Sequence, residues 1–71
     1  MNTTKTSIKI SLAAARVNAK MTQSDLASKM KVSKQTIVNW ENGKIIPKPA
    51  QFKMFCDLCE MPTDCVFLPK V

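Results

Sequence analysis

Histidine is absent from this 71-residue chain, glycine occurs once, and only five residues are acidic. The five carboxylates lie far apart in the sequence, so no pair of them points to general acid–base catalysis. A chain of this length buries only about 60% of the surface that it exposes when unfolded, so its large apolar side chains are needed for one core. These shortages argue against an enzyme, and we expect no catalytic residue, no metal and no cofactor.

Long apolar segments are also lacking. No uncharged apolar stretch approaches the ~20 residues that span a bilayer. The polar start at Met1 is not followed by the apolar region of a signal peptide. We therefore expect a cytoplasmic protein without a membrane partner.

Cysteine is present in an odd number, as Cys56, Cys59 and Cys65, which favours reduced thiols over disulfides. The spacing of the first two leaves two interpretations open. Zinc requires four ligands and the chain offers no histidine and no fourth cysteine, so packing as small apolar side chains is favoured. The alternative is a metal or a disulfide shared across a dimer.

Charge is distributed unevenly along the chain, whose net charge is +6. Residues 1–53 contain ten basic and two acidic residues, whereas residues 54–71 contain one basic and three acidic residues. We therefore expect a basic pole and a mildly acidic pole. A small basic domain suits nucleic acid or an anionic membrane surface, although charge alone is also compatible with a merely soluble basic protein.

Capping residues and apolar spacing predict an all-α domain, a compact bundle of four to five short helices over residues 11–71 after a flexible arm over residues 1–10. Ser11 offers an N-cap to a first helix over residues 12–19, and Thr22 starts a second helix that ends near Met30. No strand pattern and no repeat is present.

A third helix is expected over residues 33–42, because Ser33 is an N-cap and Gly43 stands where a helix ends in a left-handed turn. Its inward pair is Ile37 and Trp40, opposite a polar face. After a loop framed by two prolines, Pro47 and Pro49, the inner face of a fourth helix is marked by Phe52, Phe55, Cys56 and Cys59.

Two short helices joined by about three residues are typical of a helix-turn-helix. The segment over residues 23–43, QSDLASKMKVSKQTIVNWENG, resembles the family of phage Cro and CI repressors and their bacterial relatives. The matching positions are Thr22-Gln23, Leu26-Ala27, Val32-Ser33, Thr36-Ile37, Trp40-Glu41 and Gly43. The resemblance covers residues 12–67 and implies a regulator in the bacterial host cell, associated with the nucleoid.

The resemblance also implies which side chains meet DNA. Lys34, Gln35 and Asn39 would face base edges in the major groove, with Thr36 as a further candidate. Glutamine and asparagine can pair bidentately with adenine, and lysine can bind the guanine edge. Phosphate contacts are expected from Gln23, Lys31, Ser33, Asn42, Lys44 and Lys48, although each lysine among them could instead only solvate a loop.

Arg16 and Glu41 match a family pair that links the first helix to the end of the third. We expect a partly buried ion pair that positions the recognition helix, and the alternative is two exposed charges of little energetic consequence. The sequence departs from the family pattern at Lys31 and Glu60, where glycine is usual. A lysine at the turn either strains it or reshapes it.

The C-terminal part predicts a contact surface. Met54, Leu58, Phe67 and Leu68 are apolar groups that so small a core does not fully absorb, so we expect a dimer or partner interface there. These residues folded back into a monomer are the alternative. Two functions remain open: a Cro-like repressor that binds a palindromic operator as a homodimer, or an antirepressor or co-repressor that docks on a partner phage repressor.

Overall fold

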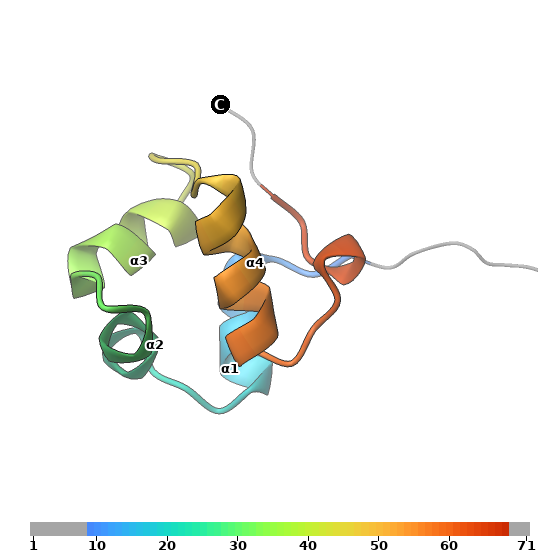
Figure 1. The fold of residues 1–71 in the computed structure, drawn as a ribbon, viewed down its shortest axis with the longest axis horizontal. Coiled ribbons are helices and arrows are strands. Elements are labelled where there is room, and N and C mark those ends of the chain that lie inside the picture. The colour runs from blue at the N-terminus through green and yellow to red at the C-terminus, as the bar shows by residue number, and fades with distance from the viewer. Residues whose placement is uncertain (1–8, 69–71) are drawn as a thin grey trace, which may run out of the picture.

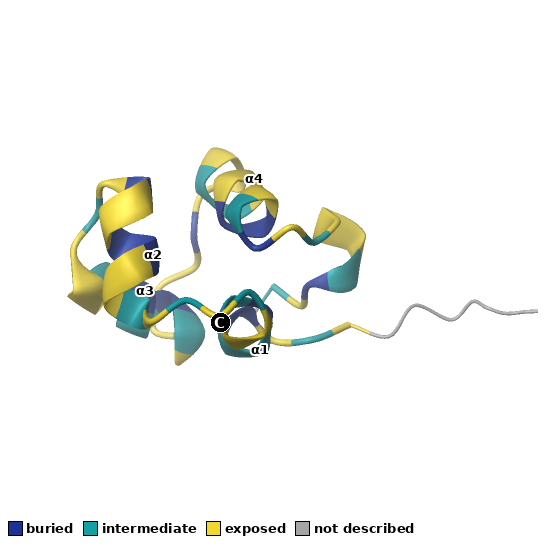
Figure 2. Ribbon diagram, turned by 90° about the horizontal axis from the view of Figure 1, so that it is seen from below, coloured by how far each residue is buried: buried dark blue, intermediate teal, exposed yellow. Residues whose placement is uncertain are grey.

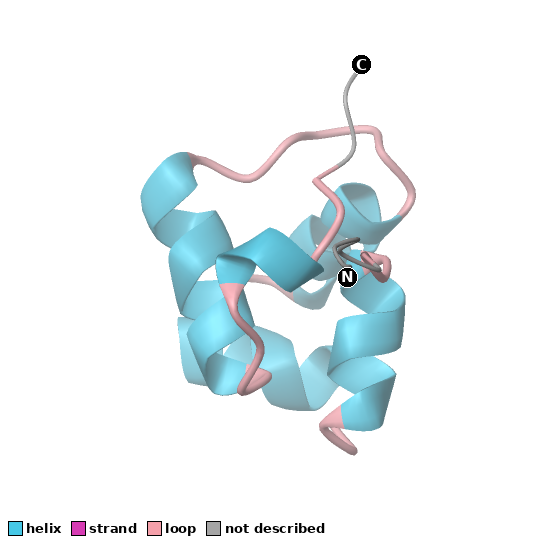
Figure 3. Cartoon of the chain, turned by 90° about the vertical axis from the view of Figure 1, so that its right-hand side faces the viewer, coloured by secondary structure: helices cyan, strands magenta, loops and turns pink. Residues whose placement is uncertain are grey.

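The computed structural model describes residues 9–68, which form four α-helices and one 3-10 helix. The elements are α1 (Leu12–Asn18), α2 (Gln23–Met30), α3 (Lys34–Glu41), α4 (Pro49–Leu58) and the 3-10 helix η1 (Thr63–Cys65). Figure 1 shows α2 and α3 together on one side of the molecule and η1 on the other. The predicted all-α fold is confirmed, and Figure 3 shows helices and loops but no strand in the described part.

The first three helices begin at the capping residues expected from the sequence. The side-chain oxygens of Ser11, Thr22 and Ser33 each accept the backbone N–H three residues later, at 2.9–3.1 Å. Asp25 completes a capping box, because its carboxylate accepts the Thr22 N–H at 3.0 Å. These hydrogen bonds, first the one from the Thr22 backbone, hold the pKa of Asp25 below its ordinary value.

The start of α4 corrects one expectation. Pro49 was expected in the loop beside Pro47, but it is the first residue of the helix. Proline suits that position because its fixed φ is helical and its missing N–H would have no partner within the helix. Lys48 is the residue before Pro49, and its backbone N–H donates to Gln51 Oε1 at 3.0 Å.

Three helices are followed by residues other than glycine in the left-handed conformation. Lys20 follows α1 with φ 63°, Lys31 follows α2 with φ 60°, and Glu60 follows α4 with φ 58°. Gly43, after α3, has φ 80°. The sequence pointed to glycine-like positions at Lys31 and Glu60, whereas Lys20 was missed. A side chain with a Cβ is strained at these angles, so each position stores a small amount of conformational energy.

The core lies where the four helices meet, and Figure 2 shows the buried segments turned inward. At its centre the rings of Trp40 on α3 and Phe55 on α4 are 6.4 Å apart and inclined at 56°, an edge-on arrangement that aromatic pairs favour. The other buried members are Leu12, Ala15, Leu26, Ala27, Met30, Ile37, Cys56, Cys59 and Val66. This single cluster fixes how α3 is presented to solvent.

Cys56 and Cys59 pack inside this core as free thiols. Burial raises the pKa of Cys56, and burial together with the neighbouring Cys56 raises the pKa of Cys59 to about 11. Both thiols therefore stay neutral near pH 7 and behave as small apolar side chains. Within residues 9–68 no three acidic or cysteine side chains gather as a metal site would require.

A short backbone pairing closes the fold. Ile10 forms a parallel bridge with Val66, in which Ile10 N–H donates to Cys65 O at 3.0 Å and Phe67 N–H donates to Ile10 O at 2.7 Å. Ile10, the last residue of the expected arm, is thus tied to the body of the domain. Figure 1 places the bridge on the side away from α2 and α3. Residues 1–8 of the expected arm lie outside the described residues.

None of the helices in the described range is long and apolar enough to cross a lipid bilayer.

Candidate nucleic-acid interface

The turn between α2 and α3 folds back on the end of α2. Val32 N–H donates to Ala27 O at 3.0 Å, and Lys31 N–H donates to Ser28 O at 3.2 Å. Lys31 occupies the left-handed position that reverses the chain. Ala27 is a small side chain, 4% exposed, on the buried face of α2, which packs against α3. This is the geometry of a helix-turn-helix.

The two faces of α3 differ sharply. Ile37 and Trp40 are 0% and 1% exposed and anchor the helix in the core. Lys34 and Gln35 are exposed on the other face, and Asn39 is half-buried there. With three or four residues per turn, these three polar side chains fall on neighbouring turns of one surface. The structure therefore brings together the three side chains for which the sequence predicted base contacts.

Thr36, the further candidate for a base contact, is directed to the helix start instead. Its hydroxyl lies 2.9 Å from the hydroxyl of Ser33, which also accepts the Thr36 N–H at 3.1 Å. Both side chains are thus engaged in capping α3. Ser33 remains exposed at the start of the helix, beside the turn.

One carboxylate joins three helices behind this surface. Glu41 on α3 accepts Arg16 Nε at 2.6 Å and Nη2 at 3.2 Å, and the two side chains are 8% and 13% exposed. Gln23, the first residue of α2, donates from Nε2 to Glu41 Oε1 at 3.0 Å. Arg16 also donates to Met21 O at 2.9 Å. The start of α2 and the end of α3 are therefore held by the same side chain.

Gln23 thereby has a role that sequence reasoning missed. The sequence placed its side chain on a phosphate, whereas the structure places its amide nitrogen on Glu41. The two residues are 18 positions apart on different helices, and no local pattern signals such a contact. The residue that was expected to bind a phosphate thus holds the start of α2 to the end of α3.

A basic hollow of about 320 Å³ opens at the start of α2, lined by Arg16, Met21, Thr22, Gln23, Ser24 and Lys34. The N-terminus of a helix carries partial positive charge, and Lys34 at the start of α3 adds a full charge. The Arg16 charge is already paired with Glu41, and among residues 9–68 Lys34 forms no ion pair. The arrangement suits a phosphate oxygen of a nucleic-acid backbone.

The remaining expected phosphate contacts lie on the turn and on the loop after α3. Lys31, Lys44 and Lys48 are all exposed. Asn42 Oδ1 accepts the Lys44 N–H at 3.1 Å, so this side chain shapes the loop that carries Lys44. Lys31 precedes α3 in the sequence, and Lys44 and Lys48 follow it. All three add positive charge to the segments next to this helix.

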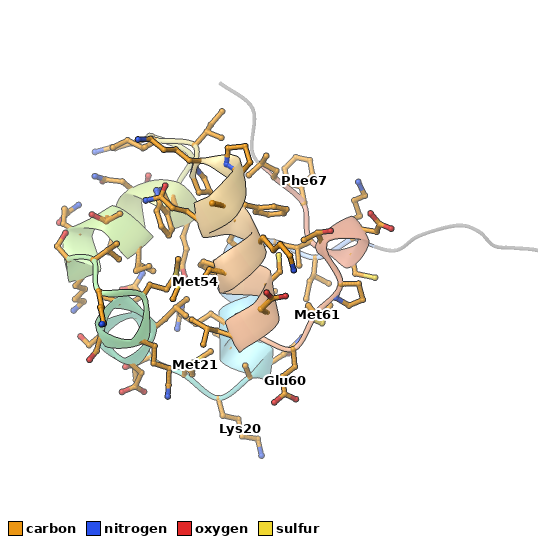
Figure 4. All side chains as sticks on the ribbon, viewed as in Figure 1. Lys20, Met21, Met54, Glu60, Met61 and Phe67 are labelled. Carbon is orange, nitrogen blue, oxygen red and sulfur yellow. The ribbon has the colours of Figure 1, made fainter. Side chains whose placement is uncertain are left out.

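The expected apolar contact surface is only partly formed by the predicted residues. Met54 is 41% exposed and Phe67 is 55% exposed, and Figure 4 shows Met54 on α4 and Phe67 on the segment that follows η1. Leu58 is half-buried and packs against the core, and Leu68 is half-buried. The structure adds Ile45 and Ile46 in the loop before α4, which are 50% and 37% exposed. Sequence reasoning missed this loop because it follows no helical period.

The turn and the packing of α2 against α3 define a helix-turn-helix domain. The helix-turn-helix family model matches residues 12–64, and the chain belongs to this family, which is that of the lambda repressor and Cro. The domain of this family is a DNA-binding regulatory domain, so the chain is a DNA-binding transcription regulator. No curated protein and no solved structure matches the chain significantly.

Proposed function

We propose that this protein is a Cro-like phage repressor that binds a palindromic operator as a homodimer, with α3 in the major groove. The observation that carries the proposal is the polar face of α3, where Lys34, Gln35 and Asn39 lie opposite the buried Ile37 and Trp40. In this proposal the protein acts on the nucleoid of the bacterial host and represses by blocking polymerase at the operator.

The charge around α3 supports the proposal. Lys34 borders the basic hollow, and Lys31, Lys44 and Lys48 are exposed on the adjoining turn and loop. The acidic residues Asp57, Glu60 and Asp64 lie instead on α4 and the segment after it. A duplex docked on α3 would thus meet the basic part of the domain, which steers association and anchors the phosphates.

The exposed apolar side chains supply a surface for the second subunit. A single small module contributes only roughly 600–1,000 Å² of contact with DNA, so a two-fold operator calls for two copies. Met54 and Phe67 are exposed outside α3 and outside the loop that carries Lys44 and Lys48, so they are available when α3 is in the groove. We assign this surface to the homodimer.

A second function uses the same surface differently. Large exposed apolar side chains also suit docking on another protein. In this candidate the chain is an antirepressor or co-repressor, and Ile45, Ile46 and Phe67 bind a partner phage repressor. The polar face of α3 would then be retained as a scaffold and would read no sequence.

Selection of binding sites from a randomised duplex pool separates the two functions. The purified chain is used at near-physiological salt, together with Gln35→Ala on α3 and, as a matched control, Lys53→Ala on α4. Recovery of an inverted repeat that changes with Gln35→Ala and not with Lys53→Ala supports the repressor. Weak binding that is indifferent to sequence overturns it in favour of the protein-docking function.

A further inference from the structure

Gln35 and Asn39 are linked on the surface of α3. Gln35 Nε2 donates to Asn39 Oδ1 at 3.0 Å, across one helical turn. Glutamine and asparagine four positions apart are known to stabilise helices through such contacts. The link leaves the two amides with different hydrogen-bonding groups to offer, although their side chains carry the same chemistry when free.

The hydrogen bond leaves different donors and acceptors free on the two side chains. Gln35 keeps its Oε1 acceptor and one N–H donor, the pair of groups that matches adenine N6 and N7 in the major groove. Asn39 keeps both donors on Nδ2, while one of the two lone pairs on its Oδ1 is taken up by Gln35. A donor suits the acceptors of thymine or guanine and is repelled by the N4 amino group of cytosine.

We propose that Gln35 and Asn39 act as one reading unit, which selects adenine at the base facing Gln35 and favours thymine or guanine over cytosine at the base facing Asn39. Asn39 sets the specificity of Gln35 by holding the plane of its amide before DNA arrives. The inference rests on the proposed function, since it concerns a helix that lies in the major groove. It goes further by naming the bases and by making one reader depend on the other.

Among the described residues, no other side chain forms a hydrogen bond with the Gln35 or Asn39 amide. The Thr36 hydroxyl lies against Ser33, at the start of the helix. Lys34 borders the hollow at the start of α2. Within residues 9–68, the side-chain hydrogen bond between two of the proposed base-reading residues is the one from Gln35 to Asn39. The orientation of the Gln35 amide therefore depends on Asn39.

Base preference is the measurement that tests the reading unit. Site selection and competition binding are carried out with wild type, Gln35→Ala, Asn39→Ala, the double variant and Asn39→Asp. Alanine has a higher helix propensity than either residue, so α3 is retained in the alanine variants. Preferences are compared as ratios between duplexes, which a uniform loss of affinity leaves unchanged.

The aspartate variant gives the sharpest prediction. Its carboxylate still accepts the Gln35 N–H but offers no donor, so adenine should stay preferred at the Gln35 position while cytosine becomes favoured at the Asn39 position. Asn39→Ala should lower the adenine preference about threefold or more, although alanine removes no group that touches adenine. In the double variant, the adenine preference should fall by a smaller factor than the product of the factors measured for the two single variants.

The outcomes separate the inference from the function on which it rests. If wild type selects a site but Asn39→Ala leaves the adenine preference intact, or the two single losses multiply, the reading unit is wrong and the repressor proposal stands. If the wild-type protein prefers cytosine at the base facing Asn39, the reading unit is also overturned. If wild type selects no site, the proposed function fails, and the inference fails with it.

Discussion

Gln23 and Glu41 lie on different helices, and the side-chain amide of Gln23 donates to Glu41 Oε1 at 3.0 Å. The same oxygen accepts Arg16 Nη2 at 3.2 Å. The hollow at the start of α2 and the reading surface of α3 are therefore held in one arrangement. In the proposed complex, a base contact by α3 and a phosphate contact at the hollow would depend on the same carboxylate.

Glu41→Gln should destabilise the domain strongly. The change keeps the shape of the side chain but leaves the Arg16 guanidinium, which is 13% exposed, without its counter-charge. Removing one partner of a buried pair costs about 3–5 kcal/mol, a large part of the stability of a small domain. Urea unfolding followed by circular dichroism measures this loss.

The double variant Arg16→Met with Glu41→Leu is the control for that experiment, because replacing both charges by apolar groups removes the unpaired guanidinium. Most of the lost stability should return. Site specificity should be impaired, since leucine removes the oxygen that accepts the Gln23 amide. A single Glu41→Gln that unfolds like wild type would show that the carboxylate does not hold the three helices.

Lys31→Gly should stabilise the fold. Lys31 has φ 60°, an angle that glycine adopts without the cost of a Cβ. We expect a gain of about 0.5–1 kcal/mol in the free energy of unfolding. Lys29→Gly removes the same charge from within α2 and should instead cost about 1 kcal/mol. Thermal unfolding of both variants checks the prediction, and equal losses in the two would contradict it.

Lys44→Ala should weaken binding to every duplex alike. Lys44 is exposed on the loop after α3, where we expect it to bind phosphate. Loss of one such contact flattens the slope of log affinity against log salt by about one. Lys53→Ala is the matched control, because Lys53 pairs with Asp57 at 3.2 Å on α4. A salt slope unchanged by Lys44→Ala would remove this residue from the interface.

The buried thiols predict a pH dependence at the alkaline end. Burial raises the pKa of Cys59 from its ordinary value of 9.0 to about 11. The folded state disfavours the thiolate, so this contribution to stability is complete below the ordinary value and is lost as the pH rises through about 11. Cys59→Ala should flatten that loss of stability in urea titrations.

Alkylation at pH 8 should reach Cys65 in the folded chain, and Cys56 and Cys59 only after unfolding.

Much of the fold could be predicted from the sequence because the helix starts depend on interactions between residues close together in the chain. The side chains of Ser11, Thr22 and Ser33 each accept the N–H of the residue three positions later, and the first three helices follow these caps. The start of α4 could not be placed, because proline is compatible with both a loop and a first helical turn. The left-handed conformation of Lys20 could not be predicted, because lysine gives no sequence signal for that conformation.

The candidate site could be predicted less completely. The side chains of α3 that face solvent follow from the helical period, since Ile37 and Trp40 fix its inner side. The link from Gln23 to Glu41 depends on how separate helices pack, and the exposure of Ile45 and Ile46 depends on a loop. Such contacts are set by tertiary structure, and no periodicity in the chain reports them.

The ratio of two dissociation constants tests the central claim, that α3 reads sequence, most directly. Fluorescence anisotropy at near-physiological salt gives the Kd for the selected inverted repeat and for the same duplex with both half-sites scrambled. We predict a ratio of about 10³ or more in favour of the repeat, as for sequence-specific binding proteins. A ratio close to one would contradict the claim and leave only electrostatic binding to the phosphate backbone.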